Sequence, residues 1–134
     1  MGGSVIQLRG SKIEAVDTTD RTINVRFAPA LVVRSEGVPG VDASTLWTQA
    51  AAMAFHDGEI EGDFPSFPAT LTGGRMTVNR LSYVDMIPIP LDSAGFLRLL
   101  LTFVGAQREL AIVGISASLE LLGHAKYIEH LPPA

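Results

Sequence analysis

The chain has 134 residues, a net charge of −4 and no cysteine. This length suits a single domain spanning residues 1–134. A hydrophobic fraction of 47% beside a charged fraction of 18% excludes a disordered protein. The ten lysines and arginines stand singly, so neither nucleic acid nor an anionic membrane surface is an expected partner. Without cysteine there is no disulfide framework, thiolate metal site or cysteine nucleophile.

The hydrophobic runs are too short for a transmembrane helix, because Arg98 and the polar residues 105–109 interrupt them. The first ten residues lack the charged and apolar regions of a secretory signal, so the cytoplasm is the expected compartment. The mean hydropathy of +0.30 is high for a chain this small. Either the core is unusually apolar or another subunit covers an apolar face, and we favour the second cause, a homo-oligomer.

Short alternating segments make up the first third of the chain. Residues 6–16 alternate on both sides of a glycine–serine break, and residues 22–28, TINVRFA, alternate throughout. The second segment predicts a strand with one solvent-facing side. Pro29 is expected to bend or end that strand, because proline donates no hydrogen bond to a ladder. Residues 31–33 predict a further short strand, and residues 35–44, rich in glycine, proline and serine, predict a loop.

Residues 45–55, TLWTQAAAMAF, are compatible with two structures. The alanines favour a helix, whereas alternate residues from Trp47 to Phe55 would share one face of a strand. A helix would also need a better N-terminal cap than this segment offers. Asp57 and Gly58 follow it directly and form a strong hairpin signal. We therefore predict a strand over residues 45–55.

Glycines and prolines punctuate the middle of the chain. Residues 64–68, FPSFP, predict an edge crossing whose two phenylalanines pack inward, since two prolines exclude a central strand. Gly73 and Gly74 predict a two-residue hairpin turn. Residues 81–87 predict one strand, and residues 92–95 predict the turn that follows it.

The most apolar stretch, residues 96–116, predicts two strands joined by a polar turn at residues 105–108. On the first strand the apolar side chains that recur at every second position are Leu97, Leu99, Leu101 and Phe103. On the second strand the apolar residues expected to face them are Leu110, Ile112, Val113 and Ile115. Burying each such side chain contributes roughly 1.5–3 kcal/mol, so this hairpin should form the centre of the core.

The alternation continues after residue 116 as far as Gly123, which is expected to break the strand. The tail beyond it fits either a last strand or a helical turn. Turn signals recur about every ten residues along the chain, a spacing typical of antiparallel sandwiches and barrels. The sequence therefore predicts an all-β domain, an antiparallel sandwich or closed barrel of about 8–10 short strands.

The densest group of ionisable residues comprises His56, Glu59, Glu61 and Asp63. On a strand its three carboxylates would share one face, and with an imidazole they could hold a divalent ion. The alternative is a solvated strand face whose charges discourage pairing between sheet edges. The spacing of calcium-binding loops is missing.

Other catalytic patterns do not occur in the sequence. His124 and His130 are six residues apart, which does not fit a zinc-protease signature, and we expect them to be exposed or near a strand end. A nucleophile elbow, a phosphate-binding loop and a dinucleotide fingerprint are also missing. The sequence therefore assigns no catalytic residue, cofactor or metal ligand, and it leaves open whether His56, His124 or His130 has a role.

Four further side chains are candidates for binding. Arg98 stands among leucines and is either an anion clamp or interface pair, or a surface residue whose stem covers apolar neighbours. Trp47, Tyr83 and Tyr127 each combine an apolar ring with a polar tip, which suits binding anchors as well as core residues.

Three functions remain compatible with these observations. The favoured one is a noncatalytic binding or assembly module that self-associates through an apolar sheet face, because the hydropathy is high and catalytic motifs are missing. The second is a barrel that encloses a small apolar ligand. The third is a hydrolase or isomerase that uses the acidic segment from His56 to Asp63, with or without a metal ion.

Overall fold

The computed structural model describes residues 3–38, 41–106 and 108–133, and in these ranges the chain forms ten antiparallel strands and no helix. The all-β prediction is therefore confirmed. Several strands are longer than expected. The strands are β1 (Gly3–Gln7), β2 (Lys12–Thr19), β3 (Thr22–Ser35), β4 (Ser44–His56), β5 (Glu59–Gly62), β6 (Ala69–Val78), β7 (Leu81–Val84), β8 (Met86–Ile89), β9 (Asp92–Phe103) and β10 (Leu110–Leu131).

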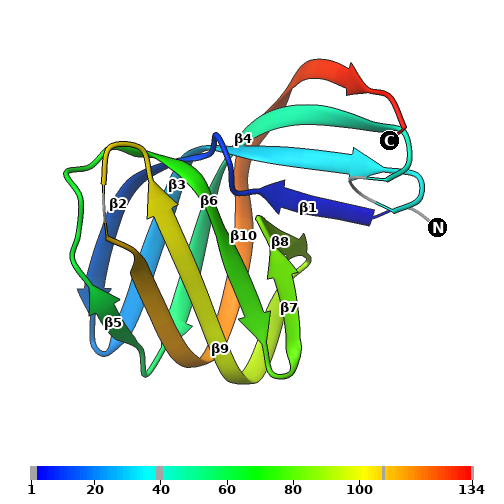
Figure 1. Cartoon of the computed structure of the whole chain (residues 1–134). Coiled ribbons are helices and arrows are strands. Elements are labelled where there is room, and N and C mark those ends of the chain that lie inside the picture. Colours follow the sequence, from blue (N-terminus) through cyan, green and yellow to red (C-terminus); the bar gives the residue numbers. More distant parts are fainter. Residues whose placement is uncertain (1–2, 39–40, 107, 134) are drawn as a thin grey trace.

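The strand pairing closes on itself and forms a barrel (Figure 1). Around the ring the order is β2, β6, β9, β10, β4 and β3, and β3 pairs with β2 again. The closing contact between β2 and β6 involves only two residue pairs, Lys12 with Thr70 and Ile13 with Ala69. In the described part of the chain, residues 14–19 of β2 therefore pair only with β3, whereas the other strands of the ring have neighbours on both sides along most of their length.

Three of the barrel strands continue beyond the ring and build a second structure, which we call the wing. The wing consists of β8, β1, residues 31–35 of β3, residues 44–48 of β4 and residues 126–131 of β10, in this order across the sheet. Figure 1 shows the wing projecting from one end of the barrel, with the C-terminal end of β10 at its margin.

The hairpin of β9 and β10 lies at the centre of the core, as the sequence predicts. Leu97, Leu99 and Leu101 are fully buried, and Leu110 and Ile112 face them on β10. The expectation for Ile115 is wrong, because its side chain is 58% exposed. A register shift between Gly114 and Ser116 interrupts the alternation there. Val113 is only partly buried, and Gln107 of the connecting turn lies outside the described residues.

The strand prediction for residues 45–55 is confirmed by β4. Ala51, Met53 and Phe55 are buried in the barrel core, while the residues between them are half-buried. Asp57 and Gly58, however, do not form a hairpin. Both β4 and β5 pair antiparallel with β10, so the chain continues in the same direction past Gly58, whose N–H donates to the carbonyl oxygen of Arg21 at 3.0 Å.

The hairpin predicted at Gly73 and Gly74 is also wrong, because β6 runs straight through both residues. A side chain at Gly74 would collide with the carbonyl oxygen of Leu100 on the neighbouring strand. The N–H of Gly74 donates to Asp85 Oδ1 at 3.0 Å. The glycine is thus required by a close approach of two backbones rather than by a turn.

The strand predicted over residues 81–87 is divided in two. Asp85 has a φ of 58°, and this left-handed residue separates β7, which pairs with β6, from β8, which pairs with β1. The turn predicted at residues 92–95 is instead the beginning of β9. Gly95 there has a φ of 120°, and Asn79 Oδ1 accepts the N–H of Phe96 at 3.0 Å beside it.

Pro29 and Gly123 do not end their strands. The register of β3 against β4 shifts between Phe27 and Ala30, and β3 then continues as far as Ser35. Gly123, with a φ of 68°, lies in an irregularity of β10, which continues as far as Leu131. Both residues mark bulges, which bend a strand without terminating it.

The proline-rich residues 64–68 connect β5 to β6 outside any strand. Phe67 packs against the core, with its ring centroid 6.2 Å from that of Phe103. Phe64 contacts Phe67 but remains exposed, so only one of the two rings packs inward as predicted.

Candidate functional site

The acidic residues that follow β4 form separate contacts rather than one site. Glu61 Oε1 lies 3.5 Å from Arg98 Nε, and Asp63 Oδ2 accepts a hydrogen bond from Arg108 Nη1 at 2.9 Å. His56 Nδ1 lies 3.3 Å from Thr22 Oγ1. Among the described residues no three His, Asp or Glu side chains are arranged to hold a metal ion. The segment therefore resembles a solvated strand face, and Arg98 is part of a half-exposed ion pair rather than a buried anion clamp.

The two C-terminal histidines are exposed on β10, each beside a shallow hollow. His124 borders one of about 240 Å³ together with Pro29, Gln49 and Lys126. Gln49 Oε1 in its wall is buried and has no hydrogen-bond partner among the described residues, although Gln49 Nε2 donates to the carbonyl oxygen of Gly123. His130 borders a second hollow, of about 310 Å³, beside Arg34.

Two of the three aromatic candidates meet on the wing. The ring centroids of Trp47 and Tyr127 are 5.3 Å apart, with an interplanar angle of 78°, which is an edge-to-face contact. The guanidinium carbon of Arg34 lies 4.5 Å from the centre of the Trp47 ring. Trp47 Nε1 donates to Thr45 Oγ1 at 2.8 Å. Tyr83, by contrast, packs against the barrel core and takes no part in this cluster.

The pairing register shows which residues share a face with these aromatic rings. One row across the wing is formed by Ile87, Ile6, Val32, Trp47 and Tyr127. The first three members are fully buried, Trp47 is half-buried and Tyr127 is 54% exposed. We call this side of the wing the aromatic face. An apolar strip therefore extends from the protein interior to solvent and ends in an exposed aromatic ring.

The next residue, Ile128, extends the exposed apolar surface. The register of β10 against β4 shifts between Tyr127 and Glu129, so Tyr127 and Ile128 together oppose Trp47. The side chain of Ile128 is 50% exposed. Two large apolar residues thus adjoin each other at the margin of the sheet, next to Arg34 and His130 in the neighbouring row.

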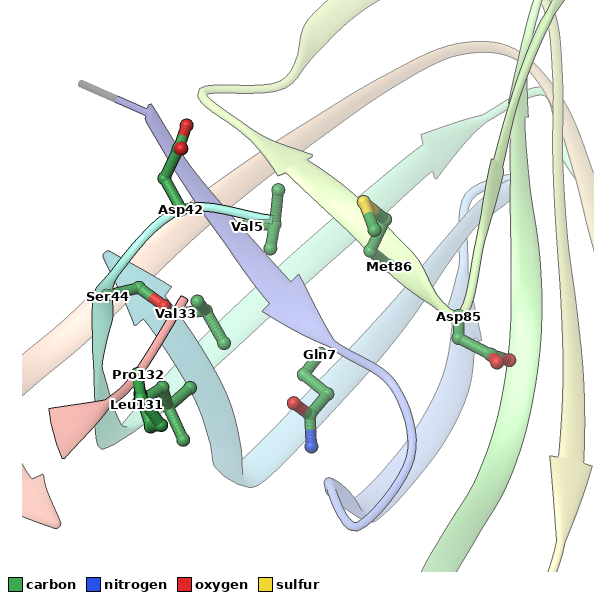
Figure 2. Close-up of a pocket in the computed structure, with 9 residues that line it drawn as sticks. All are labelled: Val5, Gln7, Val33, Asp42, Ser44, Asp85, Met86, Leu131 and Pro132. Carbon is green, nitrogen blue, oxygen red and sulfur yellow. The ribbon is translucent and has the colours of Figure 1, made fainter. Parts of the chain in front are cut away.

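The opposite side of the wing, which we call the cavity face, has a smaller apolar cluster. Val5, Val33 and Leu46 lie side by side on three neighbouring strands and are buried. They adjoin a cavity of about 210 Å³, shown in Figure 2. Its lining comprises Val5, Gln7, Val33, Asp42, Ser44, Asp85, Met86, Leu131 and Pro132. Asp42 and Asp85 lie at opposite ends of the cavity in this view.

Both carboxylates at this cavity already accept backbone hydrogen bonds. Asp42 Oδ2 accepts the N–H of Val38 at 2.6 Å, and Asp85 Oδ1 accepts that of Gly74. Their local role is therefore to hold the turns on which they stand. The walls combine the apolar Val5, Val33, Met86, Leu131 and Pro132 with the polar Gln7 and Ser44, so the cavity offers a small molecule both apolar and hydrogen-bonding contacts.

Sequence reasoning identifies part of the wing surface and misses the rest. Trp47 and Tyr127 are candidates because of their side-chain chemistry. Arg34 and Ile128 carry no motif, and only the pairing of β3, β4 and β10 brings them to the aromatic rings. Alternation along residues 31–35 and 44–48 would have assigned the faces, had the pairing of those strands been known.

In the part of the chain that the structure describes, no helix has the length and hydrophobicity needed to cross a bilayer. Comparison of the chain with protein-family models, with curated proteins and with solved structures found no match. A function for this chain therefore has to be inferred from its own residues, and the wing offers the most distinctive arrangement of them.

Proposed function

We propose that this chain is a noncatalytic binding module that self-associates through the aromatic face of its wing. The observation that carries the proposal is the exposed cluster of Trp47, Tyr127 and Arg34 at the end of a buried apolar strip. Tryptophan, tyrosine and arginine are the residues most enriched among those that dominate protein–protein binding energies. Burial of this cluster by a second copy would also account for the high mean hydropathy.

The barrel supports the wing, and its packed interior disfavours the enclosed ligand considered from the sequence. Large side chains fill that interior, among them Phe27, Phe55, Met53, Met76, Leu97 and Leu99. The four hollows described for residues 3–38, 41–106 and 108–133 lie at the wing, at a loop or along strand margins. Rigid packing of this kind suits a scaffold that presents a surface. The cytoplasmic location expected from the sequence remains a prediction.

Self-association is tested by measuring mass in solution. The wild-type chain should exceed its monomer mass of 14.3 kDa by sedimentation equilibrium or light scattering in the micromolar range. Replacing Tyr127 and Ile128 together by serine should lower the mass to that of the monomer, because both side chains are half-exposed and apolar. Replacing Val104 by serine is the matched control, because this residue is 64% exposed but follows β9 on the barrel and hydrogen-bonds the backbone of Thr70 rather than any wing strand. A wild-type mass of 14.3 kDa throughout this range would contradict the proposal.

A second candidate function is the binding of a small apolar ligand in the cavity of about 210 Å³ on the cavity face. Val5, Val33, Met86 and Leu131 support this assignment, because they line the cavity and would bury the apolar surface of such a ligand. Benzene should therefore shift the methyl NMR signals of Met86 and Leu131. The methyl signals of Leu99 in the barrel core should stay unchanged, and equal shifts at all three residues would argue against a ligand site on the wing.

A further inference from the structure

One margin of the wing is an unpaired strand edge. Along one side β10 pairs with β9 only as far as Ser118, and Leu119 donates its N–H to Leu91 at 2.9 Å. Beyond this point the described residues provide no partner on that side, whereas β4 continues on the other side as far as Leu131. Figure 1 shows this end of β10 at the boundary of the sheet. A free edge exposes backbone donors and acceptors that another strand can use.

The bulge in β10 determines which side chains along this edge share a face. Lys126 pairs with Thr48 and Glu129 pairs with Leu46, and these two residues of β4 are two positions apart. Lys126 and Glu129 therefore both lie on the cavity face, although they are three residues apart. Between them, Tyr127 and Ile128 together oppose Trp47 on the aromatic face. Residues 126–129 therefore lie on the cavity, aromatic, aromatic and cavity face in turn, and this order is the same when the strand is followed in the opposite direction.

This order is the requirement for pairing with an identical strand. A two-fold axis perpendicular to a sheet keeps each residue on its own face, so antiparallel partners must come from the same face. An axis between Tyr127 and Ile128 meets this condition and places Lys126 opposite the partner's Glu129, twice by symmetry. Shifting the register by one residue would place Lys126 opposite the partner's Ile128, on the wrong face.

We propose that β10 pairs antiparallel with β10 of a second copy in this register, which joins the two wings into one continuous sheet. This inference rests on the proposed function and specifies an edge contact, in which the two aromatic faces lie next to each other on the same side of the joined sheet. Tyr127 then lies opposite the partner's Ile128, and the two Trp47 rings border the apolar centre. A lysine and a bulge on a free edge normally discourage strand pairing. Here the bulge places Lys126 and Glu129 on the same face. Of the registers that pair residues 126–129 with one another, only this one sets each lysine opposite a glutamate and keeps every residue opposite one from its own face.

Charge reversal tests the register. In the dimer of the Lys126→Glu variant, the new carboxylate at position 126 lies opposite the partner's Glu129, and symmetry creates this repulsive contact twice. In the dimer of the Glu129→Lys variant, the new ammonium group at position 129 lies opposite the partner's Lys126, also twice. Each variant alone should therefore dimerise about tenfold more weakly than the wild type. An equimolar mixture of the two variants should recover wild-type affinity, because each chain then meets the opposite charge. Arg26→Glu, which breaks an exposed ion pair with Glu14 on the barrel, is the control and should leave the dimer unchanged.

The measurements are sedimentation equilibrium of each chain and of the mixture, with circular dichroism to verify that every variant folds. Recovery in the mixture supports the register, since a general effect of charge or misfolding would not be reversed by mixing. If both charge-reversal variants dimerise as tightly as the wild type while the double serine variant of Tyr127 and Ile128 is monomeric, the register is overturned. Self-association through the aromatic face then stands. A wild-type chain that is monomeric throughout overturns both proposals.

Discussion

At the scale of single residues, glycine in this chain has roles that its neighbours in sequence do not reveal. Gly73 and Gly74 resemble a hairpin turn locally, yet they lie inside β6. Gly74 is needed because the carbonyl oxygen of Leu100 occupies the space of a side chain. Gly105, by contrast, has a φ of 77°, and no atom lies within 4 Å of the position that a Cβ would take there, so its requirement is conformational.

These two kinds of glycine should respond differently to substitution. Gly74→Ala should lower the free energy of unfolding by about 1–3 kcal/mol, because two backbones must separate to admit the methyl group. Gly105→Ala is the comparison and should cost only about 1 kcal/mol, since it strains φ without any collision. Urea denaturation followed by circular dichroism measures both values. A smaller loss for Gly74→Ala than for Gly105→Ala would contradict this account.

At the scale of elements, the hairpin of β9 and β10 shows where alternation is a reliable guide. Leu97, Leu99 and Leu101 are buried as the two-residue period predicts. The same rule fails at Ile115, where the shift between Gly114 and Ser116 changes the register. Alternation therefore assigns faces correctly along a regular strand and loses them at a bulge, which depends on the neighbouring strand.

Truncation of this hairpin should separate its buried and exposed sides. Leu99→Ala should reduce the free energy of unfolding by about 2–5 kcal/mol, because it leaves a cavity in the packed barrel. Phe96→Ala on the same strand should cost less than about 1 kcal/mol, since that ring is 50% exposed. Chemical denaturation measures both losses, provided that the two variants show the same dependence of the free energy of unfolding on denaturant concentration. Similar losses for the two variants would contradict the placement of Leu99 in the core.

At the scale of the whole molecule, the barrel and the wing differ in how their strand edges are paired. Ring closure gives most barrel strands partners on both sides, except along residues 14–19 of β2, whereas the wing ends in β8 on one margin and β10 on the other. Pro88 and Pro90 stand at the β8 margin, where they remove backbone donors. The β10 margin keeps its donors, with Tyr127 and Ile128 beside them, and this asymmetry is why self-association is assigned to β10.

Local patterns in the amino-acid order were enough to predict that the chain is all-β, that residues 45–55 are a strand and that residues 96–116 supply the centre of the core. These features follow from the two-residue period and from side-chain hydrophobicity, which are properties of short segments. The folded chain alone revealed that glycines and prolines mark bulges, that the sheet closes into a ring, and that Arg34, Trp47 and Tyr127 meet. Each of these depends on pairing between strands distant in the chain, and such pairing is set by backbone registers and shared burial that no local pattern encodes.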